Sequence, residues 1–336
     1  MSSPQEQPGA LSEEEKIMAA RDSHWPSVLY HIHIHLAAFY GLFLIFTEAY
    51  YTTFFFAIFM VMLGSLAVNT GAHRLWSHGS YKASTGLRIA LMLAQTSVGQ
   101  CSIYDWVLDH RIHHKHFGTD KDPYNHNRGF FYAQLGSRMQ TDRSDYEKIK
   151  SEIDMSDIEQ DEVVMFQKKY YWFIMPIVAF LLPVNFPVEY WGESILVSAY
   201  VVGFFRFCLG LHLSWLVSSA VLIWGLDPKA RSSADSNLVF IVTRSHWPHY
   251  HYMLPWDYQT GEFGTYGAGC STAFIRVYAA AGWASELKTL GSDAVKEALT
   301  LAVDTGKPLV ECLNEVGLEH AKKIPDAHVL EYEKYK

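Results

Sequence analysis

Residues 110–114 read His-Arg-Ile-His-His and are followed by Lys115 and His116. Each buried neutral imidazole carries one donor and one acceptor that need partners, so three rings in five residues are not ordinary core side chains. On a helix, His110 lies one turn before His113 and His114, and we expect the three rings to converge. Convergent imidazoles suit a transition metal such as iron or zinc.

Two further histidine clusters flank this stretch. The upstream cluster is His73-Arg-Leu-Trp-Ser-His78, and the downstream cluster contains His246, His249 and His251. Three separated clusters in one chain indicate a shared site. We therefore predict that the rest of the chain brings them together at one metal centre.

Composition narrows the class of protein. The 336 residues are 49% apolar and 15% aromatic, concentrated in long runs, which points away from an ordinary soluble protein. The net charge of −8 argues against nucleic acid as a partner. The polar, acidic N-terminus shows no cleaved signal peptide. Four cysteines without CxxC spacing indicate neither disulfides nor a thiolate zinc site: Cys101, Cys208, Cys270 and Cys312.

Four apolar runs cover about residues 31–50, 53–72, 170–191 and 195–224. Each has the roughly 20 residues that a helix needs to cross the hydrocarbon layer. They form two hairpins separated by a long polar stretch. The sequence therefore predicts an all-α integral membrane protein, with four transmembrane helices and a helical cap that carries the histidines.

The basic residues predict the orientation. Thirteen of the 27 Lys and Arg residues lie between Arg74 and Lys169, and the short loops near 50–52 and 192–194 contain none. Because basic loops stay on the cytosolic side, we expect the long middle loop to be cytosolic and both termini to lie with it.

Residues 86–104 are apolar enough to suggest a fifth crossing. A crossing there would separate His73 and His78 from the central cluster, so we predict an interfacial or re-entrant helix. The expected organisation is a flexible cytosolic tail (1–24), a membrane domain (25–290) and a cytosolic helical segment (291–336).

Several motifs carry a family resemblance. They are Gly-Ala-His73-Arg-Leu-Trp-Ser-His78, Tyr104-Asp-Trp-Val-Leu-Asp-His-Arg-Ile-His-His-Lys and Pro255-Trp-Asp-Tyr-Gln-Thr-Gly-Glu. Together with Asp-Pro-Tyr-Asn and Arg128-Gly-Phe-Phe, they make residues 25–290 resemble the membrane acyl-CoA desaturases of animals, insect members most of all.

The resemblance implies a four-helix stem under a cytosolic cap in the endoplasmic reticulum membrane. It also implies two non-haem irons that use O2, and electrons from a b-type cytochrome and its reductase, to desaturate a long-chain acyl-CoA among membrane lipids. The expected metal ligands are His73, His78, His110, His113, His114 and His251, with His246 and His249 as further candidates.

Other site residues follow from the resemblance and from the chemistry of histidine ligands. By resemblance, Gln100, Trp106 and Ser214 line a bent tunnel for the acyl chain, and Arg111 meets the coenzyme A head group. Carboxylates commonly orient metal-bound imidazoles, and the candidates for this role are Asp109, Asp120 and Asp122.

The chain also departs from the family pattern. The family's last box reads His-Asn-aromatic-His-His, whereas residues 248–252 read Pro-His-Tyr-His-Tyr. Ser218 and Leu222 replace an Asn and a His that serve the metals. Three hypotheses stay open: an active desaturase with a rearranged second iron site, a non-catalytic relative that binds acyl-CoA or regulates an active desaturase, and another histidine-box oxygenase such as a hydroxylase.

Overall fold

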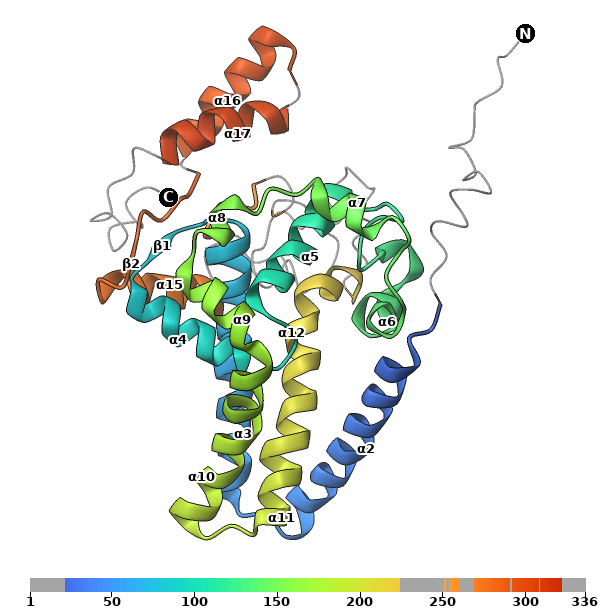
Figure 1. Cartoon of the computed structure of the whole chain (residues 1–336). Coiled ribbons are helices and arrows are strands. Elements are labelled where there is room, and N and C mark those ends of the chain that lie inside the picture. Colours follow the sequence, from blue (N-terminus) through green and yellow to red (C-terminus); the bar gives the residue numbers. More distant parts are fainter. Residues whose placement is uncertain are drawn as a thin grey trace.

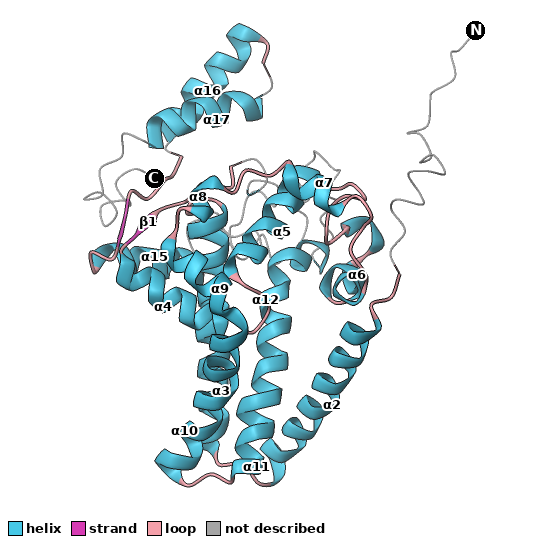
Figure 2. Ribbon diagram, viewed as in Figure 1, coloured by secondary structure: helices cyan, strands magenta, loops and turns pink. Residues whose placement is uncertain are grey.

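Four long helices form a stem, and shorter helices form a cap at one end of it (Figures 1 and 2). The computed structural model describes residues 22–223, 251, 254–259, 269–290, 292–307 and 309–321. In this part of the chain, helices dominate and one short antiparallel pair, β1 (Lys82–Ala83) with β2 (Ala284–Ser285), is the only sheet. The predicted all-α membrane fold is confirmed.

The four stem helices match the four apolar runs, and they contain 23 to 30 residues, enough to cross a bilayer. They are Trp25–Thr47 (α2), Tyr51–Ser77, Glu162–Trp191 and Ile195–Ser219. Three of them join shorter elements: α3 (Tyr51–Ala67) with η1 (Val68–Ser77); α9 (Glu162–Pro176) with η4 (Ile177–Leu181) and α10 (Leu182–Trp191); α11 (Ile195–Ser198) with η5 (Ala199–Phe205) and α12 (Arg206–Ile223).

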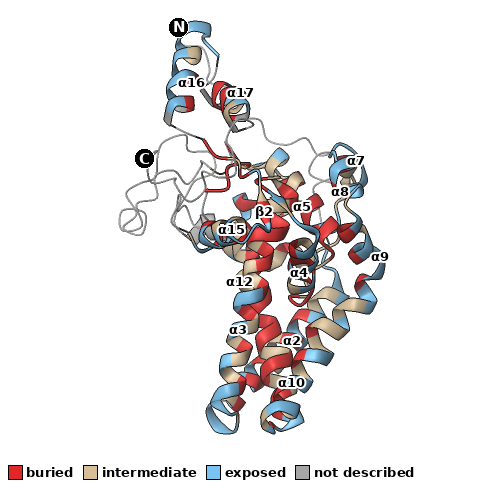
Figure 3. Ribbon diagram, turned by 90° about the vertical axis from the view of Figure 1, so that its left-hand side faces the viewer, coloured by how far each residue is buried: buried red, intermediate tan, exposed pale blue. Residues whose placement is uncertain are grey.

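The outer surface of the stem is apolar. Phe46, Tyr51 and Trp172 are each more than 80% exposed, and Figure 3 shows such exposed residues along the outside of the stem helices. A large apolar surface of this kind fits lipid rather than water. The fourth span is 56% buried, against 22 to 33% for the other three, so it is the central helix of the stem.

A buried carboxylate ties the two hairpin turns together at the end of the stem away from the cap. Glu193 Oε2 accepts hydrogen bonds from the Tyr50 backbone N–H (2.9 Å) and the Thr53 hydroxyl (2.6 Å). Trp191 Nε1 also donates to Thr53 Oγ1 (2.8 Å). Both predicted hairpins therefore end at one place (Figure 1).

The cap is built from short elements between the second and third spans and after the fourth. They are α4 (Thr85–Thr96), α5 (Ile103–His116), η2 (His126–Arg128), α6 (Phe130–Gln134), η3 (Gly136–Met139), α7 (Tyr146–Ser151), α8 (Ser156–Glu159) and α15 (Cys270–Ala280). The apolar stretch 86–104 is split between α4, a turn and the start of α5. Because α4 has only 12 residues, about 18 Å at 1.5 Å per residue, it is too short to cross.

Arg206 joins the stem to the cap. Its guanidinium is buried inside the fourth span and donates to the backbone carbonyls of Val202, Ser97 and Ala179. The Ser97 carbonyl belongs to the end of α4, and the Ala179 carbonyl lies in the π-helical turn η4. The guanidinium thus provides hydrogen-bond donors for carbonyls at a helix end and in a π-helical turn, inside an otherwise apolar stem.

Asp161 is a second junction, at the start of α9. Its side chain caps α9 by accepting from the Val163 and Val164 N–H groups. It also accepts from Trp76 Nε1 (3.1 Å) and Arg88 Nη1 (3.0 Å). One carboxylate therefore fixes η1, α4 and α9 to one another.

Both ends of the described chain contact the cap, the first through backbone hydrogen bonds and the second through a helical hairpin. Residues 22–24, which the sequence assigned to the tail, pair with residues 139–141, for example through the Ser23–Gln140 bridge. After the cap, α16 (Ser292–Thr305) and α17 (Leu309–Ala321) form a helical hairpin that packs on Trp256. Trp256 Nε1 donates to Asn314 Oδ1 (3.1 Å).

The topology can be tested with single cysteines in a Cys270→Ser background, which removes an exposed native thiol. Tyr51→Cys and Tyr190→Cys lie at the hairpin-turn end and Phe131→Cys lies in the cap, and all three positions are exposed. A membrane-impermeant maleimide added to sealed microsomes should label Phe131→Cys and leave the other two unlabelled until detergent is added. Equal labelling of all three in sealed vesicles would contradict the four-span arrangement.

Gly99 provides a test of the turn between α4 and α5. It has φ +72°, and an added Cβ would overlap the buried Phe207 ring. Gly118 has φ +74° with open space around it, so it is a matched control. Gly118→Ala should cost about 1–2 kcal/mol from backbone strain alone, and Gly99→Ala about 1–3 kcal/mol more from overpacking. Thermal unfolding in detergent should rank them in this order; similar melting temperatures would mean that Phe207 does not fix the turn.

Candidate metal centre

Helix α5 supplies two histidines on one face. Ser102 caps its start by accepting from the Asp105 N–H (3.2 Å), and His110 and His114 are four residues apart, so their rings lie one above the other. His113 lies about 100° around the helix from His114, because successive residues advance by that angle. The expected convergence of all three rings is therefore wrong for His113.

The π-helix η1 supplies two more. His73 lies inside η1 and His78 follows its last residue, so the pair is separated by five positions. A π-helix bonds residue i to i+5, and this wider turn brings such a pair to one side. Their ring centroids are 5.0 Å apart. The His-x₄-His spacing thus suits the local backbone.

Five imidazoles meet at one point, from His73, His78, His110, His114 and His251, and their ligand nitrogens all lie within 4.8 Å of one another. The Nε2 atoms are 3.0 Å apart for His78 and His110, 3.1 Å for His73 and His251, and 3.2 Å for His114 and His251. Two such nitrogens can share one proton, but five mutually close nitrogens cannot all be satisfied this way.

A cation satisfies this geometry. Metal–nitrogen bonds of about 2.1 Å place neighbouring ligand atoms about 3 Å apart, which matches the observed separations. Burial lowers the pKa of His78, His110, His114 and His251 well below the usual value, so these rings are neutral with a lone pair available. The cluster thus fits a transition metal held by nitrogen alone.

His113 points to a different neighbourhood. Its Nδ1 lies 2.9 Å from Asp122 Oδ1, and its ring centroid lies 5.1 Å from that of His126. His126 Nε2 donates to the Ser218 carbonyl, and burial lowers the His126 pKa to about 4. His126, which lies in none of the three clusters, is a neighbour that the sequence did not indicate.

The other ligands expected for a second metal are not gathered in the described part of the chain. The candidate ligands His246 and His249 lie outside it. So do Pro248, Tyr252 and the side chain of Leu222, which depart from the family pattern. Ser218 Oγ is bonded to the Trp215 carbonyl (3.0 Å). No group of three close metal-ligating side chains among the described residues includes His113.

The expected carboxylates have separate roles. Asp122 Oδ1 contacts His113 Nδ1, the position from which a carboxylate can orient an imidazole. Asp120 accepts from Asn125 Nδ2 (3.0 Å), and Asp109 accepts from the Tyr146 hydroxyl (3.1 Å). Burial raises the Asp109 pKa to about 6.

Arg111 makes a network within the cap. Its guanidinium forms two hydrogen bonds with the Asp157 carboxylate (2.8 and 2.7 Å) and also donates to the carbonyls of Trp76 and Asp154. It does not line the cavity described next. Its expected contact with a coenzyme A head group stays a prediction.

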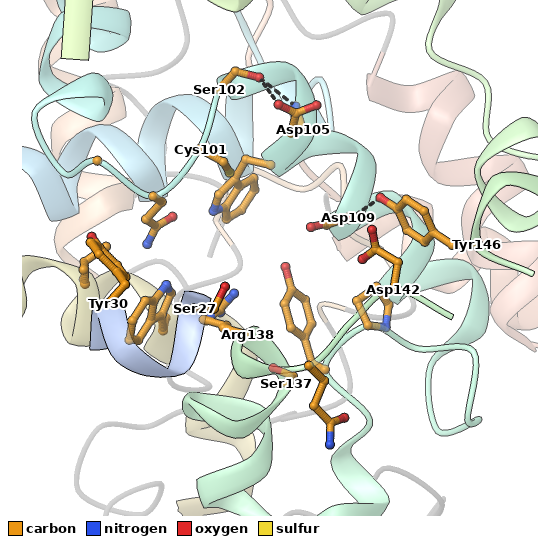
Figure 4. Close-up of a pocket in the computed structure, with 18 of the residues that line it drawn as sticks. Ser27, Tyr30, Cys101, Ser102, Asp105, Asp109, Ser137, Arg138, Asp142 and Tyr146 are labelled. Carbon is orange, nitrogen blue, oxygen red and sulfur yellow. Dashed lines mark hydrogen bonds between the residues drawn. The ribbon is translucent and has the colours of Figure 1, made fainter. Parts of the chain in front are cut away.

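A cavity of about 660 Å³ lies between the cap and the stem (Figure 4). Gln100 and Trp106 line it, while Ser214 is buried outside its lining. Trp106 stacks on His110, with ring centroids 5.0 Å apart and an interplanar angle of 18°. One side chain therefore forms both the cavity wall and a contact of the five-histidine cluster.

A second group of potential ligands, His35, Cys208 and His212, lies in the stem. Hydrogen bonds account for its rings without a metal. His35 Nδ1 donates to the His31 carbonyl (2.6 Å), His212 Nε2 donates to His35 Nε2 (2.8 Å), and Gln134 Nε2 donates to His212 Nδ1 (3.2 Å). The four cysteines are free thiols in this structure.

Comparisons with known proteins agree with the geometry, although no family model matches the chain. The chain is 44% identical over 269 residues to the acyl-CoA Delta-9 desaturase of Acheta domesticus, covering 79% of this chain and 75% of that protein. It is 38% identical to the acyl-CoA Delta-12 desaturase of Tribolium castaneum (81% and 77% covered) and 40% identical to the acyl-CoA Delta(11) desaturase of Spodoptera littoralis (78% of each).

The five-histidine cluster includes His114 but not its sequence neighbour His113, so the two should differ in their effect on metal binding. His114→Ala removes one of five converging nitrogens and should lower the metal content of the purified protein by at least about tenfold. His113→Ala should leave most of the metal of this cluster in place, and the exposed His33→Ala should change nothing. Metal per protein is measured by mass spectrometry of the desalted samples. Equal loss in the His113 and His114 variants would contradict the separation.

Proposed function

Because the chain belongs to the membrane acyl-CoA desaturase family, we propose that it removes two hydrogens from a fatty acyl chain presented as a long-chain acyl-CoA. The products are a carbon–carbon double bond and, from O2, two protons and two electrons, two waters. The observation that carries the proposal is the cluster of five converging imidazoles, beside a cavity whose wall includes Trp106.

The proposed cofactor is iron. Bound iron supplies the activation of O2 that an unactivated methylene C–H bond requires. The five neutral imidazoles would hold it without adding negative charge. A second iron, expected from the family, would use His113, oriented by Asp122, with further ligands from outside the described residues.

The residues that line the cavity would position the substrate for the reaction. Trp106 would hold the acyl chain next to His110, and the aromatic walls Tyr171 and Trp215 would exclude water around it. The relatives are named for Delta-9, Delta-11 and Delta-12 positions, so similarity does not select one position for this chain.

The proposed setting is the endoplasmic reticulum membrane, with both termini and the cap in the cytosol. There a b-type cytochrome and its reductase would supply the electrons. The basic residues of the long middle loop support this orientation, and the division into tail, membrane domain and C-terminal helical segment is proposed with it.

A second candidate is a non-catalytic relative that binds acyl-CoA or regulates an active desaturase. The neighbourhood of His113 favours it, because His126 and Ser218 are bonded to each other there instead of forming a ligand set. In this case the five-histidine cluster would hold a metal without completing the reaction.

Yeast lacking its own desaturase separates the candidates. The wild-type chain should restore growth without added unsaturated fatty acids, and gas chromatography should show a new monounsaturated product. His114→Ala should abolish both, while His33→Ala should preserve both. A correctly inserted wild-type protein that yields no product would refute the desaturase proposal and support the binding or regulatory role.

A further inference from the structure

The cavity wall contains a half-buried cation that the proposed reaction does not use. Arg138, in η3, lines the cavity, and its Nε is buried without a hydrogen-bond partner. No side-chain hydrogen bond or ion pair of Arg138 occurs among residues that the structure describes. Its guanidinium carbon instead lies 4.7 Å from the Trp215 ring centroid and 5.4 Å from that of Tyr124.

The other basic residues around the cavity have partners or reach water. Arg143 pairs with Asp145 (2.8 Å), Lys168 lies over the Tyr104 ring (3.1 Å), and Lys121 is exposed. Arg138 differs from them because its Nε is buried without a hydrogen-bond partner and two aromatic rings flank its guanidinium. Burying a charge in this way is costly unless an anion pairs with it.

Three acidic side chains line the cavity, Asp105, Asp109 and Asp142, and none forms an ion pair with Arg138 in the described chain, although Asp109 is near enough to favour its charged form. Asp109 and Asp105 belong to α5, and Figure 4 shows them on a different side of the cavity from Arg138. Asp109 accepts from Tyr146, and Asp105 accepts from the Ser102 hydroxyl (2.6 Å). The space between these groups and Arg138 belongs to the cavity itself.

Apolar side chains form part of the remaining wall, beside polar ones such as Gln100 and Asp142. Stem helices contribute Tyr30, Tyr171, Trp172, Met175 and Leu211, which suit a hydrocarbon chain. A guanidinium fork matches a carboxylate with two parallel hydrogen bonds. The cavity thus offers apolar surface together with one unpaired cation, and an amphiphilic anion complements both.

We infer that Arg138 binds a carboxylate carried by a hydrocarbon chain inside the cavity. The inference rests on the proposed function, because it assigns a ligand group to the same cavity. The carboxylate has two possible sources: a free fatty acid, or an acyl-CoA with a second carboxylate at the far end of its chain. A purely hydrocarbon acyl chain would leave the buried Arg138 Nε without a hydrogen-bond acceptor.

Two matched ligand pairs test the inference with the full-length protein in lipid nanodiscs, with empty nanodiscs as the blank. Palmitate is compared with methyl palmitate, and the mono-CoA thioester of hexadecanedioic acid with palmitoyl-CoA. The wild type should bind the carboxylate member of at least one pair about tenfold or more tightly. The pair that shows the preference identifies the source of the carboxylate.

The preference should disappear in Arg138→Leu and Arg138→Gln. It should persist in Arg128→Gln, which removes an equal charge from an exposed position outside the cavity. Thermal melting without ligand identifies any variant that fails to fold. The comparison of ligands on the wild-type protein does not depend on the variants. Equal affinity within both pairs for the wild type, or a preference that survives in a folded Arg138→Leu protein, would overturn the inference.

The proposed function fails in a distinguishable way. Palmitoyl-CoA binding by the wild type and by Arg138→Leu, without any carboxylate preference, would leave the desaturase proposal in place and remove the inference. Absence of palmitoyl-CoA binding in the wild type, with palmitate bound through Arg138, would remove acyl-CoA as the substrate and keep the anion site. Absence of binding by every ligand would overturn both.

Discussion

The convergence of five neutral imidazoles on one point is the constraint on which the structure depends. Rings from η1, α5 and His251 would crowd their lone pairs together without a cation between them. The surrounding protein must therefore hold these three separate segments in fixed positions relative to one another. Burial keeps the rings neutral, and neutral rings are the form that binds a metal.

Buried polar side chains fix these positions by forming hydrogen bonds between the segments of the stem and the cap. Asp161 joins η1, α4 and α9, and Arg206 joins the stem to the end of α4. Arg74 extends from η1 and donates to the Asp257 carbonyl (3.1 Å), which fixes the segment that follows His251. Each group satisfies backbone or indole atoms that have no water available, so loss of any one leaves an unpaired partner in the interior.

The sequence predicted the stem well because its signal is long and simple. Four apolar runs of about 20 residues have few alternatives, and the shared metal site excluded a fifth crossing at 86–104. The site was predicted in part. The histidine spacings indicated a metal centre. Adjacent residues on a helix point about 100° apart, so His113 and His114 face different neighbours even though they are next to each other in the sequence. The π-helical turn at His73 has no simple sequence signature, and His126 and Arg138 gain meaning only from their neighbours in space.

X-ray absorption at the iron edge of the purified full-length protein tests the central claim most directly. A metal held by the five-histidine cluster predicts a first shell of nitrogen or oxygen at about 2.1 Å, with outer-shell scattering from about five imidazole rings. Sulfur in the first shell, scattering from two imidazoles or fewer, or a protein that retains no iron after purification under reducing, anaerobic conditions would contradict the account.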